Sequence, residues 1–164
     1  WVFNHKNFSY KAAFTQDERQ EGSSGSLIAS AAFSHIRMQT DRSLIPALVQ
    51  PLYQEINDFR GGEFTDVTLL IGFAFTIIHE KYLYLTPSIF LGPGLQYQKY
   101  NIGGSDKSEF NLALSGNLKL SFGYNADRFF TGIFIVGTAN NIFVYDLSLT
   151  TVVANANVFA GVRI

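Results

Sequence analysis

Residues 110–124 read FNLALSGNLKLSFGY, and this stretch decides the fold because its residues alternate between two kinds. Every second residue from Phe110 to Tyr124 is apolar or glycine, whereas those between them are small and neutral apart from Lys119. A period of two predicts a β-strand with one apolar and one polar face. A sheet face in bulk water usually carries Lys, Glu, Asp and Arg. Small neutral groups suit an enclosed, wet lumen, so we expect the apolar face to point outward into lipid.

The composition excludes several classes of protein. Hydrophobic residues make up 47% of the 164 residues, which excludes disorder and suffices for one domain over residues 1–164. Every long apolar run is broken by the alternation, so no segment is predicted to span a membrane as a helix. A formal net charge of −1 gives no support for nucleic-acid binding. The absence of cysteine excludes thiol catalysis, zinc–thiolate sites and disulfides.

Six further segments have strand character, namely residues 7–15, 27–39, 64–78, 82–100, 129–145 and 150–164. The segment 129–145 is apolar on both parities, so its facing stays open. Prolines 87 and 93 each remove a ladder donor, and we expect a bulge or bend near Gly92. Seven antiparallel strands cannot close, so either residues 1–4 end another strand or the chain is the C-terminal part of a larger barrel.

The predicted fold is therefore all-β, an antiparallel up-and-down transmembrane β-barrel with about seven or eight strands seen here, part of a larger even-stranded barrel. The polar parities give the lumen-lining candidates, which are Lys11, Asp66, Ser88, Gln96, Asn111, Ser115, Asn117, Lys119, Asn155, Asn157 and Arg163. The apolar parities give the lipid-facing candidates, which are Leu69, Ile71, Phe73, Phe75, Leu112, Leu114, Leu118, Leu120, Val158 and Val162.

The connections are predicted to alternate in length. Residues 79–81 and 125–128 form tight turns, whereas the links at 40–63, 101–107 and 141–148 are longer. Transmembrane barrels have short periplasmic turns and long external loops, so we place the three long links outside and the C-terminus in the periplasm. The chain opens on Trp1 without a signal peptide, and we interpret this start as an internal one.

The long external loop, residues 40–63, carries apolar residues at spacings of three and four, which predicts a short amphipathic helix starting near Pro51. One interpretation is that this helix folds over the barrel mouth and covers its own apolar stripe. The other is that it docks a partner protein of the envelope through Leu48, Leu52 and Ile56.

No catalytic or metal site is predicted. His5, His35 and His79 lack metal-ligand spacing, and Ser34 and His35 point to opposite strand faces. Lys11, Lys119 and Arg163 could form the cationic ring of an anion-favouring pore. The alternative is that they fill the lumen with hydrogen bonds or pair with acidic groups on missing strands. We predict no enzyme activity, no cofactor and no metal.

Four stretches carry a resemblance to a known family. They are WVFNHKNFSYKAAFTQDERQ at residues 1–20, SLIP at 43–46, the LTPS and GPG motifs at 85–88 and 92–94, and FAGVRI at 159–164. The chain resembles an uncharacterised outer-membrane β-barrel family of Bacteroidetes, catalogued as a domain of unknown function. In such proteins the first block follows further strands, which implies that this chain is a C-terminal portion. It departs from the family at residues 21–26, EGSSGS, where a more basic run is expected.

The resemblance implies no activity. From the residues we expect an integral protein of the bacterial outer membrane, in contact with its lipid, with a structural, transport or accessory-subunit role and other envelope proteins as partners. The alternative is a soluble lipocalin-like barrel that binds a small apolar ligand. That alternative inverts the facing, because the apolar parity would line a cavity and the polar parity would meet water.

Overall fold

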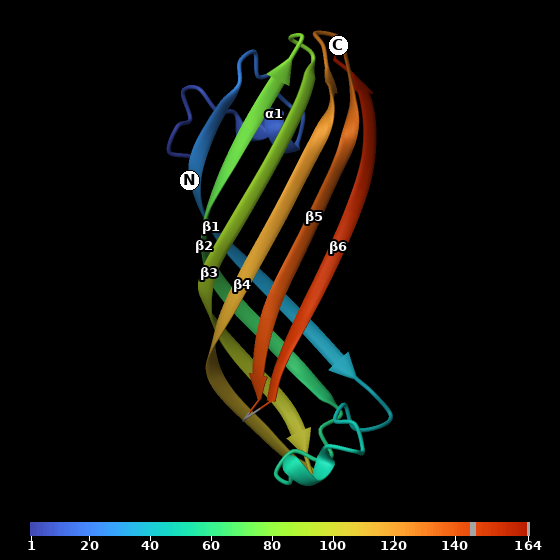
Figure 1. The fold of residues 1–164 in the computed structure, drawn as a ribbon. Helices are drawn as coiled ribbons and strands as arrows, with labels where there is room; N and C mark the ends of the chain where they lie inside the picture. Colours follow the sequence, from blue (N-terminus) through green and yellow to red (C-terminus); the bar gives the residue numbers. More distant parts are fainter. Residues whose placement is uncertain (145–146, 164) are drawn as a thin grey trace.

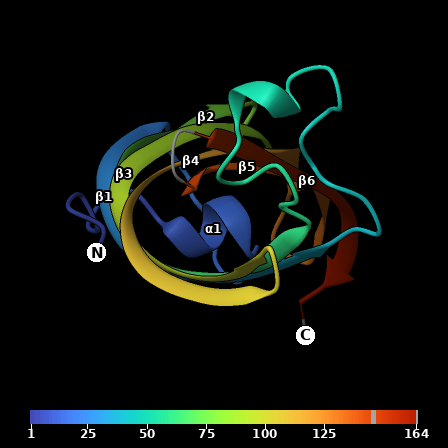
Figure 2. The ribbon, with the colours of Figure 1, turned by 90° about the horizontal axis from the view of Figure 1, so that it is seen from below.

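The computed structural model describes residues 1–144 and 147–163, and it is built around one antiparallel sheet. Its six strands follow chain order, and they are β1 (Ser24–Gln39), β2 (Gly61–His79), β3 (Leu83–Ile102), β4 (Ser105–Asn125), β5 (Phe129–Val144) and β6 (Leu147–Val162). The strands are long and twisted, and the sheet curls around the short helix α1 (Tyr10–Phe14) (Figures 1 and 2). In the described residues no ladder joins β1 to β6.

The predicted all-β, up-and-down antiparallel sheet is thus confirmed, whereas the predicted count of seven or eight strands is wrong. The structure has six strands, and hydrogen bonds do not close them into a barrel. The strands predicted at 27–39, 64–78, 82–100, 110–124, 129–145 and 150–164 correspond to β1 to β6. Residues 145, 146 and 164, which these predictions included, lie outside the described residues.

The segment predicted as a first strand, residues 7–15, contains α1 instead. The Ser9 side chain caps the helix by accepting a hydrogen bond from the Ala12 amide at 3.0 Å. The neighbouring residues Ala12 and Ala13 are both buried, as is Gln16 four residues after Ala12, and this burial fits a helix and breaks the period-two pattern. Phe8 and Ala13 pack against Ile28, Ala74 and Phe90 on the inner face of the sheet.

The bulge expected near Gly92 is absent from the ladder between β2 and β3. The same register holds on both sides of Pro93, with Thr68 opposite Gly94 and Ile71 opposite Leu91. Pro87 and Pro93 lie six residues apart, so their missing donors point to the same neighbour. Pairs with β2 are interrupted beside both prolines, while both prolines keep their partners on β4.

The link between β3 and β4, expected to be long, is a tight hairpin turn. β3 and β4 are joined through Gly103 and Gly104, whose φ angles of 58° and 81° suit glycine. β5 and β6 pair up to Val144 and Leu147, next to residues 145–146. Among the described connections between strands, the long one is that between β1 and β2. It lies with the β3–β4 turn at one end of the sheet, the loop end, at the bottom of Figure 1, while α1 and both termini lie towards the α1 end.

The facing of β5, left open by its sequence, follows from what its inner face contacts. Ile133 and Ile135 point outward and are exposed. Phe134, on the inner face, meets the ring of Phe14 edge-on, with ring centroids 5.8 Å apart. Ile142 and Val144, also inward, are fully buried at the loop end. β5 is apolar on both faces because elements inside the curled sheet cover its inner side.

Candidate functional site

The outer face of the sheet is apolar and exposed. All ten residues predicted to be lipid-facing lie on it with large exposed fractions, from 39% for Phe75 to 81% for Val158. On β4 the outward row includes Leu112, Leu114 and Leu118, which are 75%, 54% and 61% exposed. Isolated exposed leucines are ordinary on soluble proteins, but a continuous apolar face across several strands marks contact with another apolar phase or partner.

Aromatic pairs flank this apolar face at both ends. At the α1 end, Tyr82 and Tyr124 pack with ring centroids 5.6 Å apart. At the loop end, Tyr97 and Phe110 pack at 4.8 Å. Between them on β4, Leu112 and Phe122 are ten residues apart, which is about 34 Å of strand and about 26 Å of height at a tilt of about 40°. Transmembrane barrels have an apolar band about 25 Å tall between aromatic girdles.

The inner face is polar, and its side chains bond to one another. Thr76 and Thr86 hydroxyls are 2.8 Å apart, and both side chains are buried. Ser34 donates to both carboxylate oxygens of Asp66 at 2.9 Å. Gln96 also donates to Asp66, at 3.4 Å, and accepts from Gln98 at 2.7 Å. Since buried polar groups are costly unless paired, these bonds stabilise the polar interior.

The α1 end of the interior is filled by residues 8–20, here named the plug. Lys119 of β4 donates to the Tyr10 hydroxyl at 2.9 Å. Its ammonium group also lies over the rings of Tyr10, Phe14 and Phe90, at 5.5, 5.6 and 5.3 Å from the centroids. Cation–π contacts of this kind are favourable where water is excluded. Figure 2 shows α1 within the curve of the sheet.

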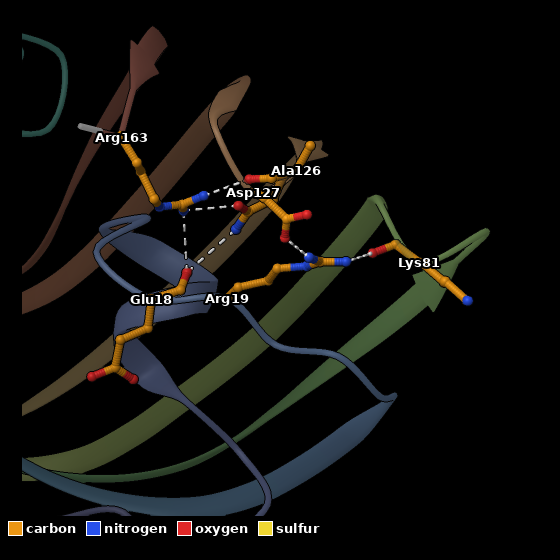
Figure 3. A network of polar contacts seen from close by, with 7 residues as sticks. Glu18, Arg19, Lys81, Ala126, Asp127 and Arg163 are labelled. Carbon is orange, nitrogen blue, oxygen red and sulfur yellow. Dashed lines mark hydrogen bonds and ion pairs between the residues drawn. The ribbon is translucent and has the colours of Figure 1, made fainter.

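A second set of contacts ties the plug to the turns and to the C-terminal segment (Figure 3). Arg163 donates to the carbonyl oxygens of Gln16 at 2.9 Å and Ala126 at 2.6 Å, and to the Asn125 side chain at 2.8 Å. Arg19 forms an ion pair with Asp127 and donates to the Lys81 carbonyl at 3.4 Å. Two arginines therefore join the plug, both short turns and the end of β6.

The loop end is closed by residues 40–60. Ile45, Ile56 and Phe59 of this loop are 3%, 2% and 0% exposed. They form one cluster with inward residues of five strands. These are Phe64, Tyr100, Ile142 and Val144 from β2, β3 and β5, together with the partly buried Met38 of β1 and Leu147 and Leu149 of β6. Both ends of the interior are thus occupied by the chain itself.

The candidate docking residues separate in the structure. Ile56 is buried in the loop-end cluster, whereas Leu48 and Leu52 are 92% and 80% exposed. The expected amphipathic helix is replaced by a three-residue 3₁₀ turn, Gln50–Leu52, with Pro51 in its first turn. The end of the curled sheet therefore covers Ile56, as the first interpretation of this loop expected, but it leaves Leu48 and Leu52 exposed.

The candidate lumen-lining residues fall into three groups. Asp66, Ser88, Gln96 and Ser115 are buried on the inner face. Asn111, Asn117, Lys119 and Arg163 are partly buried there. Asn155 and Asn157 belong to β6 and are exposed because that strand lies at an edge of the sheet. Lys11 lies on α1 with its side chain 65% exposed, and its Nζ is 3.7 Å from a carboxylate oxygen of Glu18. The three cations expected to form a ring therefore lie in different environments. Lys11 is exposed, Lys119 contacts aromatic rings, and Arg163 donates hydrogen bonds to carbonyl oxygens.

The three histidines lie on different segments of the described chain, His5 before α1, His35 on β1 and His79 on β2. His35 lies on the outward parity of β1 with its Nδ1 2.8 Å from the Thr65 hydroxyl. His79 is the last residue of β2 and lies 3.7 Å from Glu80, and both side chains are exposed. Within the described residues, no group of three His, Cys, Asp or Glu side chains could hold a metal ion. No helix in the described part of the chain is long and apolar enough to cross a membrane.

Comparison with known proteins gives one match. The family described as "Domain of unknown function (DUF4421)" matches residues 1–163. No curated protein and no solved structure matches this chain.

Proposed function

This chain belongs to the DUF4421 family, a domain of unknown function, and we propose that it forms the wall of an integral β-barrel protein of a bacterial outer membrane. Its proposed role is that of a structural or accessory subunit of the cell envelope with a plugged interior. Outer-membrane lipid is the proposed contact of the outer face, and the resemblance of residues 1–20 motivates the assignment to Bacteroidetes.

The inverted distribution of side chains carries the proposal. Gln96 and Gln98 are 1% and 0% exposed, while Leu112 and Leu118 on the neighbouring strand are 75% and 61% exposed. Burial of apolar surface drives folding in water, so a water-soluble sheet would place these pairs the other way round. Hydrocarbon reverses the preference, and the estimated height of the apolar band, about 26 Å, suits a bilayer.

The soluble lipocalin-like alternative fits the structure less well. It needs an apolar parity facing a cavity and a polar parity facing water. Here the interior holds a chain of hydrogen bonds from Ser34 through Asp66 to Gln98, together with the plug. An apolar ligand bound in this interior would lie against polar groups and offer them no hydrogen bonds, which is unfavourable.

The plugged interior favours a structural or accessory role over free diffusion of solutes. An open pore needs a continuous water path, and here the plug fills one end while Phe59 and its neighbours fill the other. In planar bilayers we expect no conductance steps from the intact protein. Steady single-channel steps would show that both ends open and would support a transport role instead.

The membrane assignment is tested by fractionation and gel mobility. We expect the protein to stay in carbonate-washed outer membranes, to need detergent for monodispersity, and to run faster in SDS gels before boiling than after, because intact barrels resist SDS. A monodisperse protein in detergent-free buffer, with the same mobility before and after boiling, would overturn the proposal and favour the soluble alternative.

A further inference from the structure

In the described residues the sheet has two edges that no strand covers, one on β6 and one on the part of β1 beyond Ala29. Side chains that point inward at these edges are open to solvent, namely Ser30 and Ala32 on β1 and Val153, Asn155 and Asn157 on β6. Inward residues of the central strands, such as Thr86 and Gln98, are 0% exposed. A lateral seam therefore runs between β1 and β6. Hydrocarbon would leave the backbone groups along the seam without hydrogen-bond partners, which a membrane-spanning structure does not tolerate.

Residues 1–3 already begin a strand at the β1 edge. The Phe3 amide donates to the Leu27 carbonyl at 3.1 Å, and the Ala29 amide donates to the Trp1 carbonyl at 2.9 Å. Val2 and Ile28 form an antiparallel bridge. Since backbone groups of alternate residues point to the same neighbour, the odd-numbered residues of β1 face this edge. Beyond Ala29, the groups of Ala31, Phe33, His35 and Arg37 continue the same row.

We infer that the free edge of β1 is covered by a β-strand of the same polypeptide that leads into Trp1 and continues the ladder begun by residues 1–3. This inference rests on the proposed function, because the need to cover the edge is strongest in hydrocarbon. The bridge between Val2 and Ile28 fixes the register. The residue two positions before Trp1 pairs with Ala31, the one three before with Ala32, and the one four before with Phe33.

The register also determines the side-chain pattern and the number of strands. Paired residues share a face, so positions two, four and six before Trp1 face outward and are expected to be apolar, while positions one, three and five face inward and are expected to be small or polar. β1 and β6 are the first and last of six alternating strands and so run antiparallel. Closure with antiparallel neighbours throughout then requires an even number of added strands.

Cysteine cross-linking in the full-length gene product tests this ladder, because the 164 residues contain no cysteine to interfere. One variant combines Ala32→Cys with a cysteine three positions before Trp1, and a second combines Ser30→Cys with a cysteine one position before. The mismatched control combines Ala32→Cys with a cysteine two positions before, whose side chain faces the opposite side. A protease site inserted at the exposed Gly22 separates the two halves of each pair.

After cleavage, we expect both matched pairs to hold the fragments together on non-reducing gels, and reductant to release them. In the mismatched variant we expect the two fragments to separate on the non-reducing gel. Equal linkage in matched and mismatched variants, or none in either matched pair of folded protein, would overturn the inference. A disulfide-linked dimer of the Ala32→Cys, Asn155→Cys variant would assign the edge to a second copy instead. Matched linkage in a protein that is water-soluble would support the added strand and refute the membrane proposal. Absence of linkage in a protein that stays in the membrane would refute the added strand and support the membrane proposal.

Discussion

Replacing Leu118 by arginine separates contact with lipid from contact with water. Leu118 lies on the outer face of β4, six residues from Tyr124 and eight from Phe110, and is 61% exposed. At about 3.4 Å per residue and a tilt of about 40°, it lies about 16 Å and 21 Å in height from the two aromatic positions, close to mid-height. Leu48, in the loop, is 92% exposed and provides a matched control with the same substitution.

The expected magnitude depends on the solvent. Arginine at the bilayer midplane destabilises a barrel by about 2–4 kcal/mol, which lowers the ratio of folded to unfolded protein by roughly 30- to 700-fold. A loop position in water changes stability by about 0.5 kcal/mol or less. If the outer face met water, Leu118→Arg and Leu48→Arg would both fall within that smaller range.

The assay is a denaturant titration of protein folded into lipid vesicles, with the folded fraction read from the gel-mobility shift. We expect a clearly lower midpoint for Leu118→Arg and an unchanged midpoint for Leu48→Arg, with equal slopes. Equal midpoints for Leu118→Arg and the unsubstituted protein would refute the orientation argument, because a charge at that height in hydrocarbon lowers stability.

Three further substitutions test the interior. Lys119→Met removes the hydrogen bond and the cation–π contacts between this lysine and the plug, so limited proteolysis should cut residues 8–20 sooner. Unchanged protection of these residues would contradict a role for Lys119 in holding the plug. Phe59→Ala leaves a cavity at a fully buried position and should lower the free energy of unfolding by about 3–5 kcal/mol, while Leu52→Ala, at an exposed position, should leave the denaturation midpoint unchanged. Similar losses for both variants would contradict the loop-end cluster. Gly92→Ala places a Cβ against the Leu69 carbonyl oxygen of β2 and should lower the stability by about 1–3 kcal/mol in the same titration, whereas the Cβ of Gly137→Ala meets no atom within 4 Å. A larger loss for Gly137→Ala than for Gly92→Ala would disprove the close approach of β2 and β3.

The sequence predicted the strands well because their alternation is a local property. In β4 each side chain reports its own facing, and Ser115 and Leu118 lie on the faces that their polarity indicates. Prolines 87 and 93 misled the prediction, since sequence does not show that both missing donors point toward β2. A bulge was therefore expected where the ladder keeps its register.

Features that depend on distant contacts were not predictable. The segment around α1 alternates like a strand, and its helical form is stabilised by the cap at Ser9 and by Lys119, which is more than 100 residues away. Asn155 and Asn157 were expected in the lumen, but their exposure follows from the position of β6 at an unpaired edge. Arg163 was expected as a pore cation, whereas its partners are carbonyl oxygens and an amide that only the fold brings near it.

The plug is tethered at both ends to the same strand. Residues 1–3 bond to the edge of β1 just before the plug begins, and β1 itself starts at Ser24, four residues after the plug ends. The segment is therefore a loop anchored at both ends on one strand, so while both anchors hold it can leave the interior only as a loop and not as a free end. Emptying the α1 end with both anchors intact would require the plug to give up its contacts with Lys119 and Arg163, so these two side chains act as the latch of the loop.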